Sequence, residues 1–220
     1  MFLLGLATGV TLLTVSAYRR VSPSWLKRLL MGCGLLMAGR YVTMALFAAT
    51  ADPARVWPLH RLWLGSAVGL TFPGVVAVDQ LIRHPAMTPR KLLRWCSPFL
   101  IAYGAVMLAG DAAPVADRVA GWAPRLAPLW RLILSVVQAL FVIGFIGLCL
   151  LLMRKIPSAS IRKPLLALSA AYAYLGADGL LIASGHWYFR PFLYSELAAL
   201  LALWYAYETA HALQQQSLSL

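Results

Sequence analysis

Residues 128–153 have the sequence PLWRLILSVVQALFVIGFIGLCLLLM, in which Arg131 is the one charged residue. A helix rises 1.5 Å per residue, so about 20 apolar residues cross a hydrocarbon core of about 30 Å. This run exceeds that length and predicts a transmembrane helix that tilts or protrudes from the bilayer. The fold class follows from it, because an uninterrupted apolar run of this length is typical of a membrane span.

Six further apolar runs flank this one, and most of them are also long enough to span a bilayer. The seven runs cover residues 2–18, 29–49, 62–82, 96–113, 128–153, 165–184 and 191–211. We therefore predict an all-α polytopic membrane bundle of seven transmembrane helices. It forms a single domain over residues 1–213, followed by a short cytoplasmic tail at 214–220. The longest hydrophilic stretch between runs is 111–127.

The composition excludes several classes of protein. The 220 residues are 61% hydrophobic and 12% charged, whereas a soluble domain has about 45–50% apolar and about 25% charged residues. The mean hydropathy is +0.76. A soluble enzyme, a disordered tail and a disulfide-built secreted module do not have this composition. The three cysteines, which lie in or beside apolar runs, are expected to be buried free thiols.

The basic residues are distributed unevenly between the loops. Alternate loops and their flanks carry twelve of them without an acidic residue: Arg19, Arg20, Lys27, Arg28, Arg83, Arg90, Lys91, Arg94, Arg154, Lys155, Arg162 and Lys163. The positive-inside rule then predicts an N-terminus outside and a C-terminus inside. The net charge of +12 indicates contact with the lipid bilayer and its anionic headgroups rather than with nucleic acid. The compact chain with minimal loops predicts a bacterial inner (cytoplasmic) membrane.

Three ionisable residues stand out because they lie at hydrocarbon depth within predicted spans, where a charge is costly and usually faces a cavity or a partner. They are Arg40, Asp178 and Glu196. Asp178 and Glu196 lie on consecutive antiparallel helices, about 10 and 8 Å from their outer ends at 1.5 Å per residue. The two helices are expected to pack side by side, with the carboxyls at similar depth in the outer half of the bundle. Two carboxyls close together could carry a proton.

These three residues, with Gln138 and Tyr174, form our predicted ligand-binding set: a polar pocket open to the outside. The alternative is a buried ion pair or hydrogen-bond set that only holds helices together. The sequence does not show whether the helix with Arg40 packs near the other two.

The third run contains TFPG at residues 71–74. Proline removes a backbone hydrogen bond and usually kinks a helix. Pro73 and Gly74 are therefore predicted either as a hinge, as in the discontinuous helices of transporters, or as a static kink.

No catalytic signature accompanies these residues. The spans contain no lysine for a retinal Schiff base and no deep histidine pair for haem. Motifs of serine hydrolases, zinc proteases, P-loop enzymes and thiol redox proteins are also missing. We therefore predict no metal site and no cofactor. The missing catalytic motifs also favour a protein that is not an enzyme, without deciding the question.

Two resemblances add function hypotheses. The predicted layout resembles the seven-helix input regions of bacterial sensor kinases. Residues 174–181 (YLGADGLL) and 203–208 (LWYAYE) are similar to the end of the lysoplasmalogenase-like membrane hydrolases, which implies a catalytic acid or base at Asp178. The family's earlier Gly-Asp element is replaced here by the TFPG segment, and its eight spans exceed the seven predicted.

The leading hypothesis is a membrane sensor or receptor-like protein that binds a small-molecule or lipid ligand in the outer half. It would signal to a partner protein at the basic cytoplasmic loops, because the chain shows no output domain of its own. One alternative is a small-solute or proton-coupled transporter, with the carboxyl pair as proton site. The other is a lipid-acting membrane hydrolase.

Overall fold

The computed structural model describes residues 2–85, 87–117, 121–183 and 191–218, and helices account for most of them. Seven α-helices follow one another: α1 (Phe2–Tyr18), α2 (Ser24–Ala49), α3 (Gly65–Ile82), α4 (Pro89–Ala109), α5 (Pro128–Lys155), α6 (Ala159–Ala183) and α7 (Pro191–Leu218). Two 3-10 helices, η1 (Pro53–Arg55) and η2 (Trp57–Leu64), precede α3. The all-α class is confirmed.

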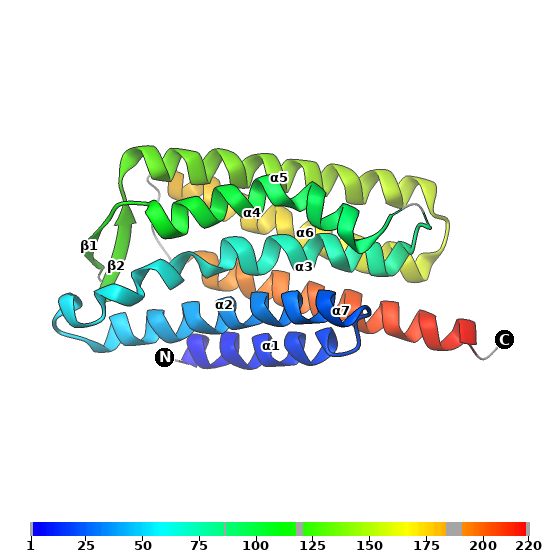
Figure 1. Cartoon of the computed structure of the whole chain (residues 1–220), viewed down its shortest axis with the longest axis horizontal. Helices are drawn as coiled ribbons and strands as arrows, with labels where there is room; N and C mark the ends of the chain where they lie inside the picture. Colours follow the sequence, from blue (N-terminus) through cyan, green and yellow to red (C-terminus); the bar gives the residue numbers. More distant parts are fainter. Residues whose placement is uncertain (1, 86, 118–120, 184–190, 219–220) are drawn as a thin grey trace.

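The helices form one elongated bundle (Figure 1). Each helix packs against the next, and α7 packs against α1, so that the seven helices close into a ring. Helices α3 and α7 also pack against each other across this ring. As a result, α7 contacts α1, α3 and α6, and is the helix that joins the early and late halves of the chain.

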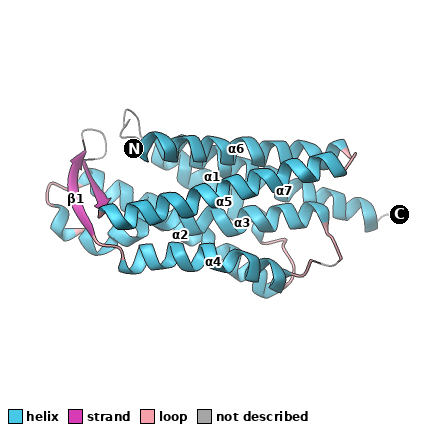
Figure 2. Ribbon diagram, turned by 90° about the horizontal axis from the view of Figure 1, so that it is seen from above, coloured by secondary structure: helices cyan, strands magenta, loops and turns pink. Residues whose placement is uncertain are grey.

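The two ends of the bundle differ. The N-terminus, η1, η2 and a small hairpin lie at one end, which we call the hairpin end (Figures 1 and 2). The C-terminus lies at the opposite end, together with the loop residues 19–23, 83–85, 87–88 and 156–158. This opposite end carries the twelve basic residues of the alternate loops, and we call it the basic end.

Within the described residues, five helical segments are long and apolar enough to cross a membrane: Ser24–Ala49, Trp57–Ile82, Pro89–Ala109, Pro128–Lys155 and Ala159–Leu181. The second of these joins η2 to α3. Helix α1 has 17 residues and is shorter than the others. Helix α7 has 28 residues, but glutamates, tyrosines and glutamines lower its hydropathy.

The helix bounds shift from the predicted runs where local signals act. Helix α4 begins at Pro89 rather than 96, because Thr88 accepts a hydrogen bond from the Lys91 backbone N–H at 3.3 Å and proline is favoured in the first turn. It ends at Ala109 rather than 113, with Gly110 as its C-cap. Helix α7 continues to Leu218 and thus includes most of the expected tail, since glutamine is a good helix former.

The hairpin comprises β1 (Ala112–Asp117) and β2 (Gly121–Leu126), paired antiparallel. It lies within the hydrophilic stretch 111–127, where we predicted no strands. Gly121 has a φ of 73°, and a Cβ there would lie 3.0 Å from the Phe47 carbonyl oxygen of α2. Only glycine accepts both this backbone conformation and this close approach, so the hairpin is seated against the end of α2.

The interior of the bundle is closely packed. Its largest fully buried side chains include Tyr18, Tyr41, Tyr172, Phe47 and Phe72. A Cβ at Gly69 of α3 would lie 2.7 Å from Cγ of Met37, so α2 and α3 approach closely at a small residue. Cys33, Cys96 and Cys149 are free and buried, as predicted.

Candidate functional site

Arg40 of α2 and Glu196 of α7 form a buried ion pair. The Nε atom of Arg40 lies 3.0 Å from Oε1 and 3.1 Å from Oε2 of Glu196. Their side chains are 4% and 1% exposed. A buried charge is tolerated when it is paired and hydrogen-bonded, so each of these residues requires the other. The structure thus brings together two of the predicted residues whose contact the sequence does not show.

The guanidinium of Arg40 has further partners on the segment before α3. Its Nη1 atom donates to the backbone carbonyl of Trp63, and its Cζ atom lies 5.8 Å from the centroid of the Trp63 ring. Trp63 lies near the end of η2, where 3-10 geometry gives way to α-helix and backbone bonding changes. Arg40 therefore joins α2, α7 and the start of α3.

Asp178 of α6 is paired with the residue next to Glu196. Its carboxylate accepts a hydrogen bond from the Ser195 hydroxyl, and both residues are buried, at 4% and 0% exposed. Ser195 and Glu196 are adjacent on α7, yet they contact α6 and α2 respectively. The predicted side-by-side packing of α6 and α7 is confirmed.

One carboxylate oxygen in this region, Oδ2 of Asp178, has neither a hydrogen-bond nor an ion-pair partner among the described residues. Oε1 of Glu196 accepts no hydrogen bond within the described part of the chain but lies 3.0 Å from Nε of Arg40. Tyr41 adjoins Arg40 in the chain and lies beside Glu196. An unsatisfied buried polar atom costs about 1–3 kcal/mol, and each such atom calls for an explanation, which can be a water or a ligand.

Gln138 and Tyr174 are placed differently from each other. Gln138 of α5 is half-buried and faces Gly179, where a Cβ would lie 3.8 Å from its Nε2 atom. Since Gly179 follows Asp178, Gln138 extends the polar region to α5. Tyr174 lies one turn before Asp178 but is 44% exposed, on the surface of the bundle.

We call the buried or half-buried set the polar layer. It comprises Arg40, Tyr41, Gln138, Asp178, Ser195 and Glu196. It crosses the bundle through α2, α7, α6 and α5, and it lies nearer the hairpin end, since Arg40 is about 13 Å from the end of α2 and Glu196 about 8 Å from the start of α7. Polar side chains at such depth in a membrane helix are functional candidates.

The TFPG segment lies in the middle of a continuous α3 and is contacted by two tyrosines. The Tyr172 hydroxyl of α6 donates to the Leu70 carbonyl at 2.5 Å, and the Tyr207 hydroxyl of α7 donates to the Pro73 carbonyl at 3.0 Å. A Cβ on Gly74 would overlap the Tyr172 hydroxyl. Pro73 and Gly74 thus contact the two helices that carry Asp178 and Glu196.

The basic end also carries polar contacts. Nη1 of Arg20 lies 2.6 Å from Oε2 of Glu208 in a partly exposed ion pair. Among the described residues, no group of three or more histidine, cysteine, aspartate or glutamate side chains could hold a metal ion.

Sequence reasoning missed Tyr41, Ser195 and Trp63. Tyr41 and Ser195 directly adjoin predicted residues, so chain adjacency is a signal that could have found them. Trp63 acts through its backbone carbonyl, which no side-chain pattern reveals.

Comparisons of the chain with family models, with curated proteins and with solved structures found no match.

Proposed function

We propose that this chain is a seven-span protein of a bacterial inner membrane, with its N-terminus outside. It binds a small or lipidic ligand at the polar layer and passes the change to a partner protein at the basic end. Helices α1 and α7 complete the seven spans, since both run alongside the five apolar segments. The concentration of arginine and lysine at one end supports a cytoplasmic location for that end.

The observation that carries the proposal is the arrangement of Ser195 and Glu196. These neighbours on α7 bond to Asp178 on α6 and to Arg40 on α2, while Oδ2 of Asp178 keeps free hydrogen-bonding capacity in the interior. A ligand with a hydroxyl, amine or amide group satisfies such an atom. Binding there changes the contacts of three helices at once.

Transmission to the basic end has a structural route. Helix α7 passes from the polar layer to Tyr207, whose hydroxyl holds the Pro73 carbonyl of α3. Helix α3 continues from there to the loop residues 83–85 at the basic end. A ligand at the polar layer shifts the packing of α7 against α3 only if its affinity differs between two arrangements of these helices.

The proposal is tested by native mass spectrometry of the full chain in mild detergent. We expect a discrete bound small molecule or lipid on the unaltered protein, and its loss in Asp178→Asn, which keeps the shape of the side chain. Asp79→Asn on α3 is the matched control and should keep the bound species. A protein without a bound species, or one whose species persists in Asp178→Asn, would contradict ligand binding at this layer.

A proton-coupled transporter is the second candidate, and Asp178 favours it. This buried carboxyl has a hydroxyl partner but no basic partner among the described residues, so proton binding there does not break an ion pair. Proteoliposomes with an internal pH-sensitive dye would report proton entry, which Asp178→Asn should abolish and Asp79→Asn should not. A pH gradient that decays equally in all three samples would count against transport.

A further inference from the structure

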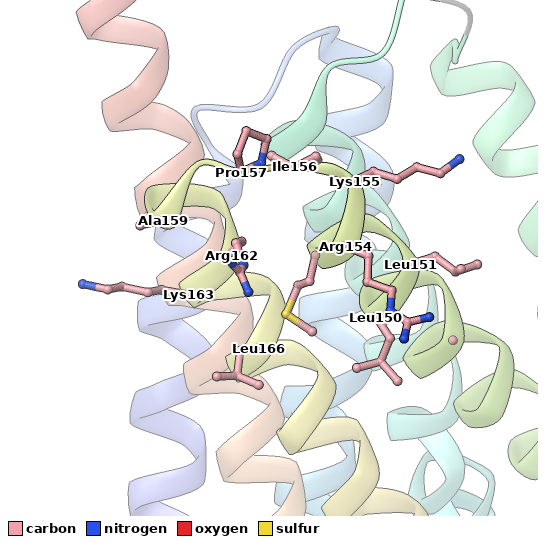
Figure 3. Close-up of a pocket in the computed structure, with 12 residues that line it drawn as sticks. Leu150, Leu151, Arg154, Lys155, Ile156, Pro157, Ala159, Arg162, Lys163 and Leu166 are labelled. Atoms are coloured by element: carbon pink, nitrogen blue, oxygen red, sulfur yellow. The ribbon is translucent and has the colours of Figure 1, made fainter.

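A second concave site lies at the basic end, far from the polar layer along the bundle. It is a groove of about 1300 Å³ between the end of α5 and the start of α6. Arg154 and Lys155 line it from α5, and Arg162 and Lys163 line it from α6 (Figure 3). Arg162 lies between the two helices, whereas Lys155 and Lys163 extend to opposite sides.

The charge of this groove is not balanced by the protein. All four basic side chains are exposed, and none of the ion pairs within the described residues includes them. No acidic residue lines the groove. The site therefore presents four positive charges to its surroundings.

The helix dipoles favour a positive charge at only two of these four basic residues. Arg154 and Lys155 lie in the last turn of α5, where cations are stabilising, but Arg162 and Lys163 lie at the start of α6, where the positive end of the dipole disfavours them. The α6 start is itself a place that favours an anion. An anion in the groove would stabilise both arginines and the helix start together.

The remaining walls of the groove are apolar. Leu150, Leu151 and Leu166 are 50%, 57% and 59% exposed and lie about one turn deeper in the bundle than the basic residues. Gly147, one turn deeper again, leaves open space, since a Cβ there would meet no atom within 4 Å. The basic residues could bind the phosphate of a lipid headgroup, and the exposed leucines one turn deeper could contact the acyl chains of the same lipid.

We propose that this groove binds an anionic phospholipid, with its phosphate between Arg154 and Arg162 and its acyl chains along the leucines. Guanidinium groups bind phosphate oxygens in a bidentate manner, and basic pockets between membrane helices on the cytoplasmic side bind such headgroups. A headgroup with two phosphates binds more tightly than one with a single phosphate, because four cations line the site. This site is separate from the polar layer.

The test is native mass spectrometry of the full chain in detergent, titrated with cardiolipin, phosphatidylglycerol or phosphatidylcholine. We expect cardiolipin to bind most tightly and phosphatidylcholine least. The variant Arg154→Gln/Arg162→Gln should lose about tenfold or more in cardiolipin affinity, since each basic residue near an anionic lipid contributes roughly a factor of five. Lys27→Gln/Arg28→Gln removes the same charge from the start of α2, at the same end of the bundle, and should keep the affinity.

Four results would overturn the proposal. They are equal loss in both double variants, equal binding of phosphatidylcholine, displacement of the lipid by inorganic phosphate at similar concentration, and co-purification of a polypeptide that occupies the groove in place of lipid. Arg154→Lys/Arg162→Lys keeps the charge but not the bidentate geometry, so it should bind cardiolipin more weakly than the unaltered protein and more tightly than the glutamine variant, which separates lost binding from lost folding. Cardiolipin binding by the unaltered protein must also weaken as salt is raised.

Discussion

Arg40 of α2 and Glu196 of α7 are 156 residues apart in the chain, yet Nε and Oε2 lie 3.1 Å apart in the interior of the bundle. Both helices pack against α1 and α3, so the long arginine side chain reaches α7 between them. This contact ties the first half of the chain to the last helix. Its energetic role can be measured directly.

We expect Arg40→Gln and Glu196→Gln each to lower the free energy of unfolding by about 3–5 kcal/mol, because each leaves a buried charge without its partner. The double variant should lose clearly less than the sum of the two. Unfolding in detergent mixtures with rising denaturant measures all three. Glu208→Gln, which breaks the partly exposed pair with Arg20, is the control and should cost about 0–1 kcal/mol. Additive losses from the two buried variants would show that the pair is not coupled.

Gly74→Ala should destabilise the protein, because its Cβ would overlap the Tyr172 hydroxyl of α6. Overpacking of this kind typically costs about 1–3 kcal/mol. Gly144→Ala on α5 is the matched control, since its Cβ would meet no atom within 4 Å. Alanine favours helix by up to about 1 kcal/mol over glycine, so this control should be neutral or stabilising. Thermal unfolding measures the stability of both variants. Equal stability changes in the two would refute the close contact between Gly74 and Tyr172.

Tyr172→Phe and Tyr207→Phe should each cost about 0.5–1.5 kcal/mol in unfolding free energy, because each removes a hydrogen bond to an α3 carbonyl. Tyr205→Phe, two residues away from Tyr207 and 38% exposed, should change stability by less. The same denaturant titration gives all three values. A cost at Tyr205 as large as that at Tyr207 would argue against a specific role for the buried hydroxyl.

Membrane topology can be tested by cysteine labelling in intact cells. Ala116→Cys in β1 and Ser158→Cys between α5 and α6 are both exposed, and the three native thiols are free but buried, so background labelling should be low. An impermeant maleimide should label the hairpin cysteine from outside, and the other only after lysis. Labelling of both positions from the same side would rule out the proposed orientation.

Much of the fold follows from local patterns. Apolar runs near 20 residues predict helices, and α1 and α5 begin at the predicted residues, since apolar content and proline mark their starts. The hairpin could not be predicted in this way, because Pro114, Pro124 and several alanines disfavour strands. Its pairing depends on contact with α2, which is a tertiary effect.

The candidate site was predictable in part for a similar reason. A charge within an apolar run is conspicuous, so Arg40, Asp178 and Glu196 stand out from the sequence. Their partners do not, because Ser195 and Tyr41 are ordinary residues for a membrane helix. Tyr172 and Tyr207 also resemble other tyrosines of their helices, and only packing selects them as donors to α3.

Pro73 removes one backbone hydrogen bond from the interior of α3, which makes this position the easiest place for the helix to bend. Tyr207 lies about 16 Å along α7 from Glu196 at 1.5 Å per residue, so a rotation of α7 about its own axis at the polar layer moves the hydroxyl that holds Pro73. The Tyr172 hydroxyl of α6 bonds to the Leu70 carbonyl nearly one turn earlier, so both α6 and α7 are hydrogen-bonded to α3 at or just before the proline. A displacement of α7 at the polar layer would therefore reach the part of α3 that follows the proline and ends at Ile82.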